Sequence, residues 1–259
     1  MKMNAVLLAG GEISPDDPMY PQAPYGKRSL IDIHGKPMVQ WVLDALCSSA
    51  RVSKVYIMGL KSETNLRSTK PLHFMTDQGD LFDNIRAGVL KSAEEHPGLD
   101  KVLIVAADIP ALKPEMIDWL VEKVAQDPGK LIYYNVIPRE VMEDRYPDAG
   151  RSYVRLRDIT VCGGDLNAID PRLFEQDQPI WKRLTESRKH PMKQVSLLGL
   201  DNLILIAFRL LSLDDAVHRI CKKLSITARA LVNPYAEIAM DADKPHQLEI
   251  LRRDLEFQK

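Results

Sequence analysis

The sequence has little cysteine, no excess of either charge and no long hydrophobic run. Its 3 cysteines are far apart and odd in number, which excludes a disulfide framework and a zinc-knuckle spacing. The 35 basic residues balance 36 acidic ones, and a net charge of −1 argues against a globally basic nucleic-acid-binding protein. The most apolar region, residues 197–213, is interrupted by Asp201, Asn202 and Arg209, so no segment approaches the roughly 18 apolar residues that span a bilayer. Since the short apolar run near the start is no secretory leader, we expect a reduced, cytoplasmic protein that binds neither nucleic acid nor membrane.

Several familiar enzyme motifs are also missing. No G-x-x-x-x-G-K-[ST] loop is present and no G-x-G-x-x-G follows a strand, which disfavours P-loop NTPases and Rossmann dinucleotide-binding enzymes. The 6 histidines form no H-E-x-x-H pair and no cluster with cysteine, so a zinc site is not expected. A G-x-S-x-G nucleophile elbow is absent, which leaves an α/β-hydrolase unsupported. The chemistry therefore has to come from carboxylates, lysine and glycine-rich turns.

The remaining pattern is that of an α/β protein. A chain of 259 residues with 45% hydrophobic residues can bury a sizeable core without disulfides. Short apolar runs alternate with amphipathic stretches, which predicts a parallel sheet with helices on both faces. The expected strands cover 4–8, 29–33, 55–58, 72–75, 101–106, 131–137, 152–156 and 226–231, and the expected helices cover 37–50, 81–93, 114–125, 171–187, 213–224 and 245–257.

A glycine corner follows the first expected strand, in the segment LLAGG at 7–11. Backbone N–H groups at such a corner can bind phosphate, and a lysine beyond it, Lys27, would add positive charge. The stretch between them, residues 12–26, contains four prolines and is expected to be a long loop. A plain glycine turn is the simpler alternative, because a Gly-Gly pair alone has little specificity.

Three aspartates are candidates for a metal site. Asp108 follows the apolar run KVLIVA, at the end of a strand where ligands of open α/β sheets bind. A carboxylate there can hold Mg²⁺, although aspartate also suits a turn before a helix. Asp241 and Asp243 lie two residues apart, so in an extended segment both would point to one side. The alternative for Asp243 is that it caps the last helix.

Taken in order, these motifs resemble the nucleotidyltransferase superfamily, and most of all its MobA-like NTP transferase group. The resemblance depends on LLAGG, on Lys27 with GKPM at 35–38, on ADIP at 107–110, on GGDLN at 163–167 and on MDADKPHQLE at 240–249. It implies a Rossmann-like, mostly parallel, three-layer α/β sheet of the nucleotide-diphospho-sugar transferase, or glycosyltransferase-A, type. It also implies one domain over 1–259, with a nucleotide-binding half at about 1–137 and an acceptor-binding half at about 138–259.

The activity that the resemblance implies is Mg²⁺-dependent transfer of a nucleotidyl group from an NTP, GTP or CTP, to a phosphorylated small-molecule acceptor, with release of pyrophosphate. Lys27 and Asp108 would be catalytic, through neutralisation of charge rather than through a covalent nucleophile. The remaining roles are nucleotide binding by Leu8, Ala9, Gly10, Gly11, Lys27 and Arg28, metal binding by Asp108, Asp241 and Asp243, and acceptor binding by Gly164 and Asn167.

The sequence departs from the family pattern at two places. The arginine and glycine usual shortly after LAGG are replaced by the proline-rich loop 12–26, and Arg28 adjoins Lys27 instead. Asp165 and Asn167 stand where relatives often read GGN. The acceptor, the base, the oligomeric state, the role of the loop and the choice between Asp241 and Asp243 stay open.

Two other functions are compatible with these motifs. One is a glycosyltransferase that uses a nucleotide sugar, although its Asp-x-Asp pair would be expected in mid-chain rather than at 241–243. The other is a nucleotide-binding regulatory protein without turnover, which the altered loop suggests.

Overall fold

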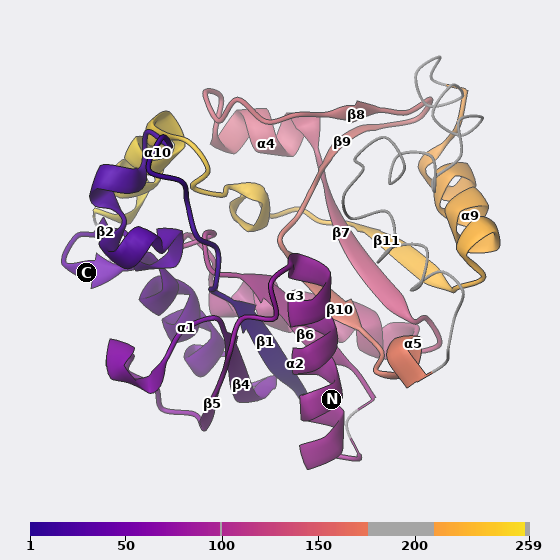
Figure 1. The fold of residues 1–259 in the computed structure, drawn as a ribbon. Helices are drawn as coiled ribbons and strands as arrows, with labels where there is room; N and C mark the ends of the chain where they lie inside the picture. Colours follow the sequence, from indigo (N-terminus) through magenta and orange to yellow (C-terminus); the bar gives the residue numbers. More distant parts are fainter. Residues whose placement is uncertain (99, 176–209, 257–259) are drawn as a thin grey trace.

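A mixed, mostly parallel sheet lies at the centre of the molecule (Figure 1). The structure, a computed structural model, describes residues 1–98, 100–175 and 210–256, and within these ranges the sheet has nine strands. The strands are β1 (Met3–Leu8), β4 (Val52–Met58), β5 (Leu72–Met75), β6 (Val102–Ala106), β7 (Ile132–Pro138), β8 (Val154–Arg155), β9 (Thr160–Gly163), β10 (Leu166–Ile169) and β11 (Ala228–Val232). Their order is β5-β4-β1-β6-β10-β7-β9-β8, and β11 also pairs with β7.

The strand directions decide where the site lies. β1 pairs in parallel with β4 and β6, β4 with β5, and β7 with β11. Only β10 and β9 run against the others in the described sheet. Because Leu8 is aligned with Ala106, the glycine corner after β1 and Asp108 after β6 lie at the same end of the sheet, beyond the carboxyl ends of these strands.

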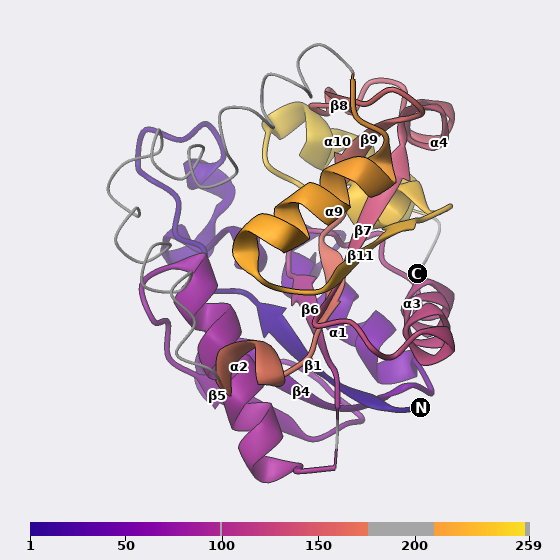
Figure 2. The same cartoon turned by 90° about the vertical axis from the view of Figure 1, so that its right-hand side faces the viewer.

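Helices cover both faces of the sheet, as Figure 2 shows for α2 (Leu81–Glu95) and α3 (Pro114–Gln126). Successive strand residues face opposite sides. Ala5 and Leu7 accordingly belong to the core cluster that holds the buried side chains of α3 and of α1 (Met38–Ser48), whereas Val6 clusters with Val89 of α2. The second cluster is tightly packed, since a Cβ added at Gly88 of α2 would lie 2.6 Å from Cγ1 of Val6.

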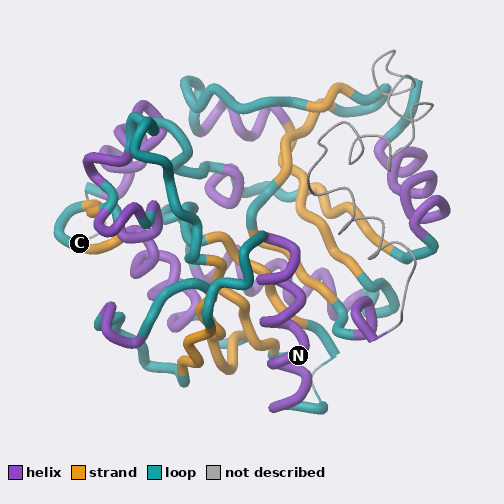
Figure 3. Tube along the Cα trace, viewed as in Figure 1, coloured by secondary structure: helices purple, strands orange, loops and turns teal. Residues whose placement is uncertain are grey.

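Further helices surround the strands, and Figure 3 shows the strands in the interior with helices and loops around them. These helices are α4 (Arg139–Arg145), the short α5 (Arg172–Glu175), α9 (Leu213–Leu224) and α10 (Pro245–Leu255). The last helix lies beside the long loop, because Arg252 of α10 donates to the Gln22 side chain at 2.8 Å and to the Asp32 carbonyl at 3.0 Å.

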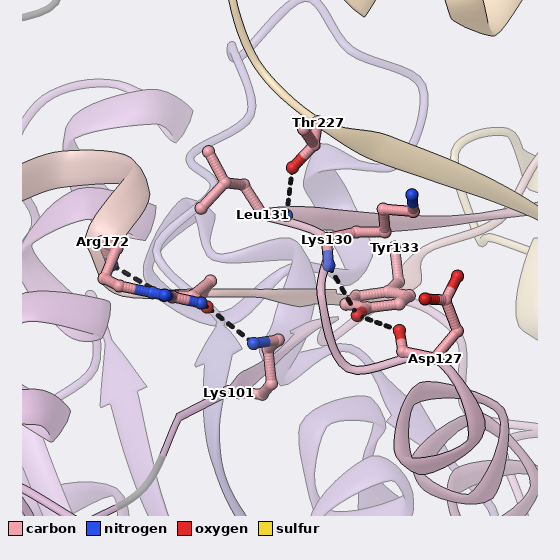
Figure 4. Close-up of polar contacts among 8 residues, drawn as sticks. Lys101, Asp127, Lys130, Leu131, Tyr133, Arg172 and Thr227 are labelled. Atoms are coloured by element: carbon pink, nitrogen blue, oxygen red, sulfur yellow. Dashed lines mark hydrogen bonds and ion pairs between the residues drawn. The ribbon is translucent and has the colours of Figure 1, made fainter.

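A buried ion pair lies at the other end of the sheet, before the start of β6 (Figure 4). Lys101 Nζ lies 2.6 Å from Asp170 Oδ2, and each side chain is only 1% exposed. Arg172 adds a hydrogen bond from Nε to Asp170 Oδ1 at 2.9 Å. Burial acts to raise the pKa of Asp170, but the hydrogen bonds from Arg172 and Lys101 outweigh it and lower the pKa. The pair therefore joins the start of β6 to the end of β10 in ionised form.

Most of the expected strands and helices are confirmed, but β9, β10 and α4 were not expected, and the strand expected at 29–33 differs. Of the strand expected at 29–33, only β2 (Asp32–Ile33) forms, and it pairs with β3 (Lys36–Pro37) outside the main sheet. Arg28–Leu30 instead forms a 3-10 turn. The reason is that hydrogen bonds from the Arg28 amide to the Gly11 carbonyl and from the Ser29 hydroxyl to the Ala9 carbonyl tie this segment to the glycine corner.

The long loop at 12–26 is also confirmed, with short 3-10 turns at Tyr20–Gln22 and Pro24–Gly26. The helix expected at 171–187 is seen only as α5, and the rest of that range, like residues 197–209 of the apolar region, lies outside the described residues. In the part of the chain that the structure describes, no helix has both the length and the apolar character needed to cross a membrane.

Candidate active site

A cleft of about 950 Å³ opens at the carboxyl ends of β1 and β6. Its walls come from the glycine corner, the turn between β5 and α2, the start of β10 and the segment before α10. This is the position at which open α/β sheets bind ligands. Carboxylates dominate its polar lining, with Asp77, Asp80, Asp108, Asp165, Asp241 and Asp243 all contributing.

The glycine corner forms one wall through Leu8, Gly10 and Gly11. Gly10 is closely packed, because a Cβ there would lie 2.8 Å from Oδ2 of Asp77 and 3.1 Å from the Gly59 Cα. Gly59, which follows β4 with φ +83°, packs even closer, and a Cβ on it would lie 2.1 Å from the Gly10 Cα. Gly11 has open space around its Cβ position and presents its backbone to the cleft.

Lys27 lies at the rim of this wall. Its Nζ donates to the Gly10 carbonyl at 2.8 Å and lies 2.9 Å from Oε1 of Glu12. Both partners line the cleft, whereas Lys27 itself does not. The ammonium is thus held beside the corner, and its contact with a phosphate stays a prediction.

Ala9 and Arg28 line a smaller hollow of about 140 Å³ that shares Leu8, Gly11 and Asp108 with the cleft. The Arg28 guanidinium forms an ion pair with Asp243. Arg28 therefore connects the predicted nucleotide wall to the predicted metal ligands.

Asp108 and the pair Asp241/Asp243 come together although they are distant in sequence. The Ala242 amide donates to the Asp108 carbonyl at 2.9 Å, and Ala242 itself is fully buried between two aspartates that line the cleft. The capping alternative for Asp243 is wrong, because Lys244 is the N-cap of α10 and the Gln247 side chain accepts from the Asp243 and Lys244 amides. The metal-binding roles of these aspartates stay predictions.

Burial and like charge perturb the carboxyl groups strongly. Desolvation, with the charges of Asp241 and Asp243, raises the pKa of Asp108 to about 6. Desolvation, with the charges of Asp108 and Asp241, raises the pKa of Asp165 to about 7. Such carboxylates are poised to accept a cation.

Arg151 is a site residue that the sequence did not reveal. It stands in the loop between α4 and β8, and its guanidinium forms an ion pair with Asp241 in which both side chains are mostly buried. Its Nη2 also approaches the Gly163 carbonyl at 3.4 Å. No motif marks this charged segment, so only the fold could show that Arg151 contacts Asp241, which lines the cleft.

The predicted acceptor residues, Gly164 and Asn167, line the cleft at the start of β10. The Asn167 side chain accepts from the Asn135 amide at 2.8 Å and donates to the Gly164 carbonyl at 2.9 Å. It therefore fixes the join between β7 and β10. Nearby, Tyr134 is 45% exposed, and a Cβ on Gly163 would lie 2.2 Å from the Tyr134 hydroxyl.

The turn between β5 and α2 was also missed. Asp77 accepts from the Gly79 amide at 2.8 Å and from Asn84 Nδ2 at 2.9 Å, and the hydrogen bonds from Asn84 and Gly79 lower its pKa. An ionised carboxylate thus faces the cleft beside Gly10. The Asp-Gln-Gly-Asp segment at 77–80, a turn before a helix, was the available signal.

The donors in the cleft fit Mg²⁺ in kind. They are carboxylates, and Oδ2 of Asp165 is buried with no hydrogen-bond partner among the described residues. Within the described ranges, no group of three or more His, Cys, Asp or Glu side chains is already arranged around a metal position. Mg²⁺ commonly uses one or two carboxylates together with substrate phosphates and water, so a complete protein cage is not required.

Comparisons with known proteins place this geometry in context. A family model described as the MobA-like NTP transferase domain matches residues 5–146. A solved structure from Thermus thermophilus, described as a hypothetical transferase, is 31% identical with a TM-score of 0.81, and the match covers 96% of this chain and 100% of that one. A CMP:2-keto-3-deoxy-manno-octonic acid synthetase solved with CTP matches with a TM-score of 0.61 at 14% identity, which shows the fold alone.

Two curated relatives match over part of their length. A probable molybdenum cofactor guanylyltransferase of Thermococcus sibiricus is 27% identical over 124 residues, which are 47% of this chain and 55% of that protein. A 3-deoxy-manno-octulosonate cytidylyltransferase of Geotalea uraniireducens is 27% identical over 130 residues, 49% of this chain and 47% of that protein. The chain thus spans about half the length of the curated relatives it matches.

Proposed function

The chain belongs to the MobA-like NTP transferase family, and on this basis we propose that it is a Mg²⁺-dependent nucleotidyltransferase. It transfers a nucleotidyl group from an NTP to a phosphorylated small-molecule acceptor and releases pyrophosphate. GTP and CTP are the first nucleotides to test, because relatives are named as a guanylyltransferase and as a cytidylyltransferase.

One observation carries the proposal: a single cleft is lined by the glycine corner on one side and by Asp108, Asp241 and Asp243 on the other. The first wall offers backbone N–H groups at Gly11, with the Lys27 ammonium at its rim. The second offers carboxylates, and burial together with the like charges of Asp241 and Asp243 raises the pKa of Asp108. Backbone N–H groups and a lysine suit the phosphates of a triphosphate, and carboxylates suit a divalent cation.

The reaction needs positioning and charge neutralisation more than acid–base catalysis. An oxygen of the acceptor phosphate attacks the α-phosphorus of the NTP and forms a new P–O bond. The bond between the α-phosphorus and the oxygen that bridges to the β-phosphorus breaks, and pyrophosphate leaves with that electron pair. The acceptor phosphate is already ionised near neutral pH, so no general base is required. Lys27, directed by the Gly10 carbonyl and Glu12, would neutralise charge on the triphosphate.

Mg²⁺, held by Asp108 with Asp241 or Asp243, would supply Lewis-acid stabilisation of the phosphate oxygens. The backbone hydrogen bond from the Ala242 amide to the Asp108 carbonyl holds the segment that carries Asp241 and Asp243 beside Asp108. Arg28 lies between Asp243 and the glycine corner and would orient the triphosphate.

The test is pyrophosphate release from each of the four NTPs with Mg²⁺ and a panel of phosphorylated acceptors. Asp108→Asn should lower the rate by about 100-fold or more, the order seen when one electrostatic group is removed from an active site. Asp214→Asn, at an exposed position of α9, is the matched control and should not change the rate. Unchanged activity in Asp108→Asn would exclude the role given to Asp108.

The same assay separates the two alternatives. Transfer from nucleotide sugars without use of NTPs would identify a glycosyltransferase. Tight NTP binding with no product from any acceptor would identify a binding protein without turnover.

A further inference from the structure

The cleft carries more negative charge than its arginines can balance. Asp108, Asp165, Asp241 and Asp243 line it, and two arginines form ion pairs with two of these aspartates. Arg28 pairs with Asp243 from the side of the glycine corner, and Arg151 pairs with Asp241 from the side of β9 and β10. Asp108 and Asp165 have no arginine partner among the described residues, so this part of the cleft is short of positive charge.

Unsatisfied buried atoms gather at the same place. Buried side-chain atoms without a hydrogen-bond partner in the described ranges include three at these ion pairs and their neighbour. They are Nε of Arg28, Nε of Arg151 and Oδ2 of Asp165. Buried polar atoms are normally paired, so such a concentration indicates that ligand atoms complete the hydrogen bonding.

Arg151 has the free capacity to bind an anion. A guanidinium carries five N–H donors in a planar fork. Arg151 uses Nη1 on Asp241 and a long contact from Nη2 to the Gly163 carbonyl, while Nε has no partner in the described part of the chain. The edge formed by Nε and Nη2 has the geometry for a bidentate contact with a phosphate, and because Nε is buried the guanidinium has to move before it makes that contact.

We propose that Arg151 binds the phosphate of the acceptor, and that its ion pair with Asp241 is exchanged when a cation binds. In the ligand-free protein, Arg151 neutralises Asp241. When a divalent cation takes the Asp241 carboxylate, the guanidinium is released to the acceptor phosphate, on the opposite side of the cleft from Arg28. The inference rests on the proposed function, because it assigns the acceptor subsite of that reaction.

The exchange makes phosphate binding depend on the cation, and calorimetry can measure this without turnover. Inorganic phosphate, as a probe of the acceptor phosphate, should bind wild-type protein only weakly without Mg²⁺ and clearly with it. In Arg151→Gln, affinity with Mg²⁺ should fall by about 10–100-fold, the value of charge-assisted hydrogen bonds. GTP and CTP binding should change little in this variant, whereas Arg28→Gln should show the reverse selectivity.

A second variant tests the exchange itself. Asp241→Asn removes the partner that holds Arg151, so phosphate should bind this variant without Mg²⁺ about as tightly as it binds wild type with Mg²⁺. Thermal melts check that each variant folds, and Arg151→Lys, which keeps the charge, replaces Arg151→Gln if that variant does not.

Two results would overturn the proposal. One is that Arg151→Gln binds phosphate as tightly as wild type in the presence of Mg²⁺. The other is that Asp241→Asn still needs Mg²⁺ to bind phosphate. Equal loss of phosphate and nucleotide binding in Arg151→Gln would assign Arg151 a structural role and also overturn it. Failure of the transfer assay with these binding results intact would reject the proposed function alone.

Discussion

Replacing Asp165 with asparagine should stabilise the ligand-free protein at alkaline pH. Burial and the charges of Asp108 and Asp241 raise the pKa of Asp165 from its ordinary value of 3.8 to about 7. One pKa unit corresponds to 1.36 kcal/mol, so ionised Asp165 costs the folded state about 4 kcal/mol at pH 8. Water entry and relaxation of the cleft reduce this, and we expect a gain of about 2–4 kcal/mol in Asp165→Asn.

The pH dependence follows from the sign of the shift. Between pH 4 and pH 7 folded Asp165, with its pKa of about 7, holds a proton that the unfolded chain has lost, so the stability that it contributes falls as pH rises. The difference between variant and wild type should be absent below about pH 4, grow through pH 7 and stay constant above it. Asparagine has no such titration, and its amide can donate to the neighbouring carboxylates.

Urea unfolding at several pH values measures this difference, with Asp148→Asn at an exposed loop position as the control. The control should track wild type throughout. If Asp165→Asn is no more stable than wild type at pH 8, or if the gain does not vary with pH, the carboxylates of the cleft do not repel one another as argued.

Two further predictions concern packing away from the reacting groups. Lys101→Met should lower the free energy of unfolding by about 1–3 kcal/mol, because the buried Asp170 carboxylate loses one cationic partner and keeps only its bonds from Arg172, whereas Lys222→Met at an exposed position should change it little; equal urea midpoints would contradict this. Gly59→Ala should cost at least about 2 kcal/mol, since φ is +83° and the new Cβ would lie 2.1 Å from the Gly10 Cα, and it should also weaken NTP binding in calorimetry; wild-type affinity would show that the glycine corner does not bind the nucleotide.

The fold could be predicted from the sequence where the signal is local. The run VLIVA at Val102–Ala106 forms the buried central strand β6, and Pro114 begins α3, because continuous apolar residues and a helix-starting proline act within a few residues. The segment at 29–33 could not be predicted in the same way. Its alternating pattern favours a strand, but hydrogen bonds to Ala9 and Gly11, distant in sequence, turn the chain instead.

The site residues also divide into those that a local sequence signal places and those placed by contacts between residues distant in sequence. Asp108 could be placed because strand ends meet at one edge of a parallel sheet. Arg151 could not, since its position depends on an irregular loop meeting the segment before α10. Asn167 was predicted at the acceptor side and does line the cleft, yet its side-chain hydrogen bonds to the backbone at Asn135 and Gly164 show that it also joins two strands, which no motif reveals.

The charge of the cleft also sets a requirement on the nucleotide. Arg28 is occupied by Asp243, so a triphosphate that arrives alone meets uncompensated carboxylates rather than a free guanidinium. Repulsion between the negatively charged triphosphate and the carboxylates of this partly buried site disfavours binding until a cation neutralises the carboxylates. Removal of divalent cations with a chelator should therefore weaken NTP binding by at least about tenfold in calorimetry. Asp243→Asn should restore part of that affinity without any metal, because it releases Arg28. Tight NTP binding by the chelated wild type would mean that the arginines, and not a cation, balance the triphosphate.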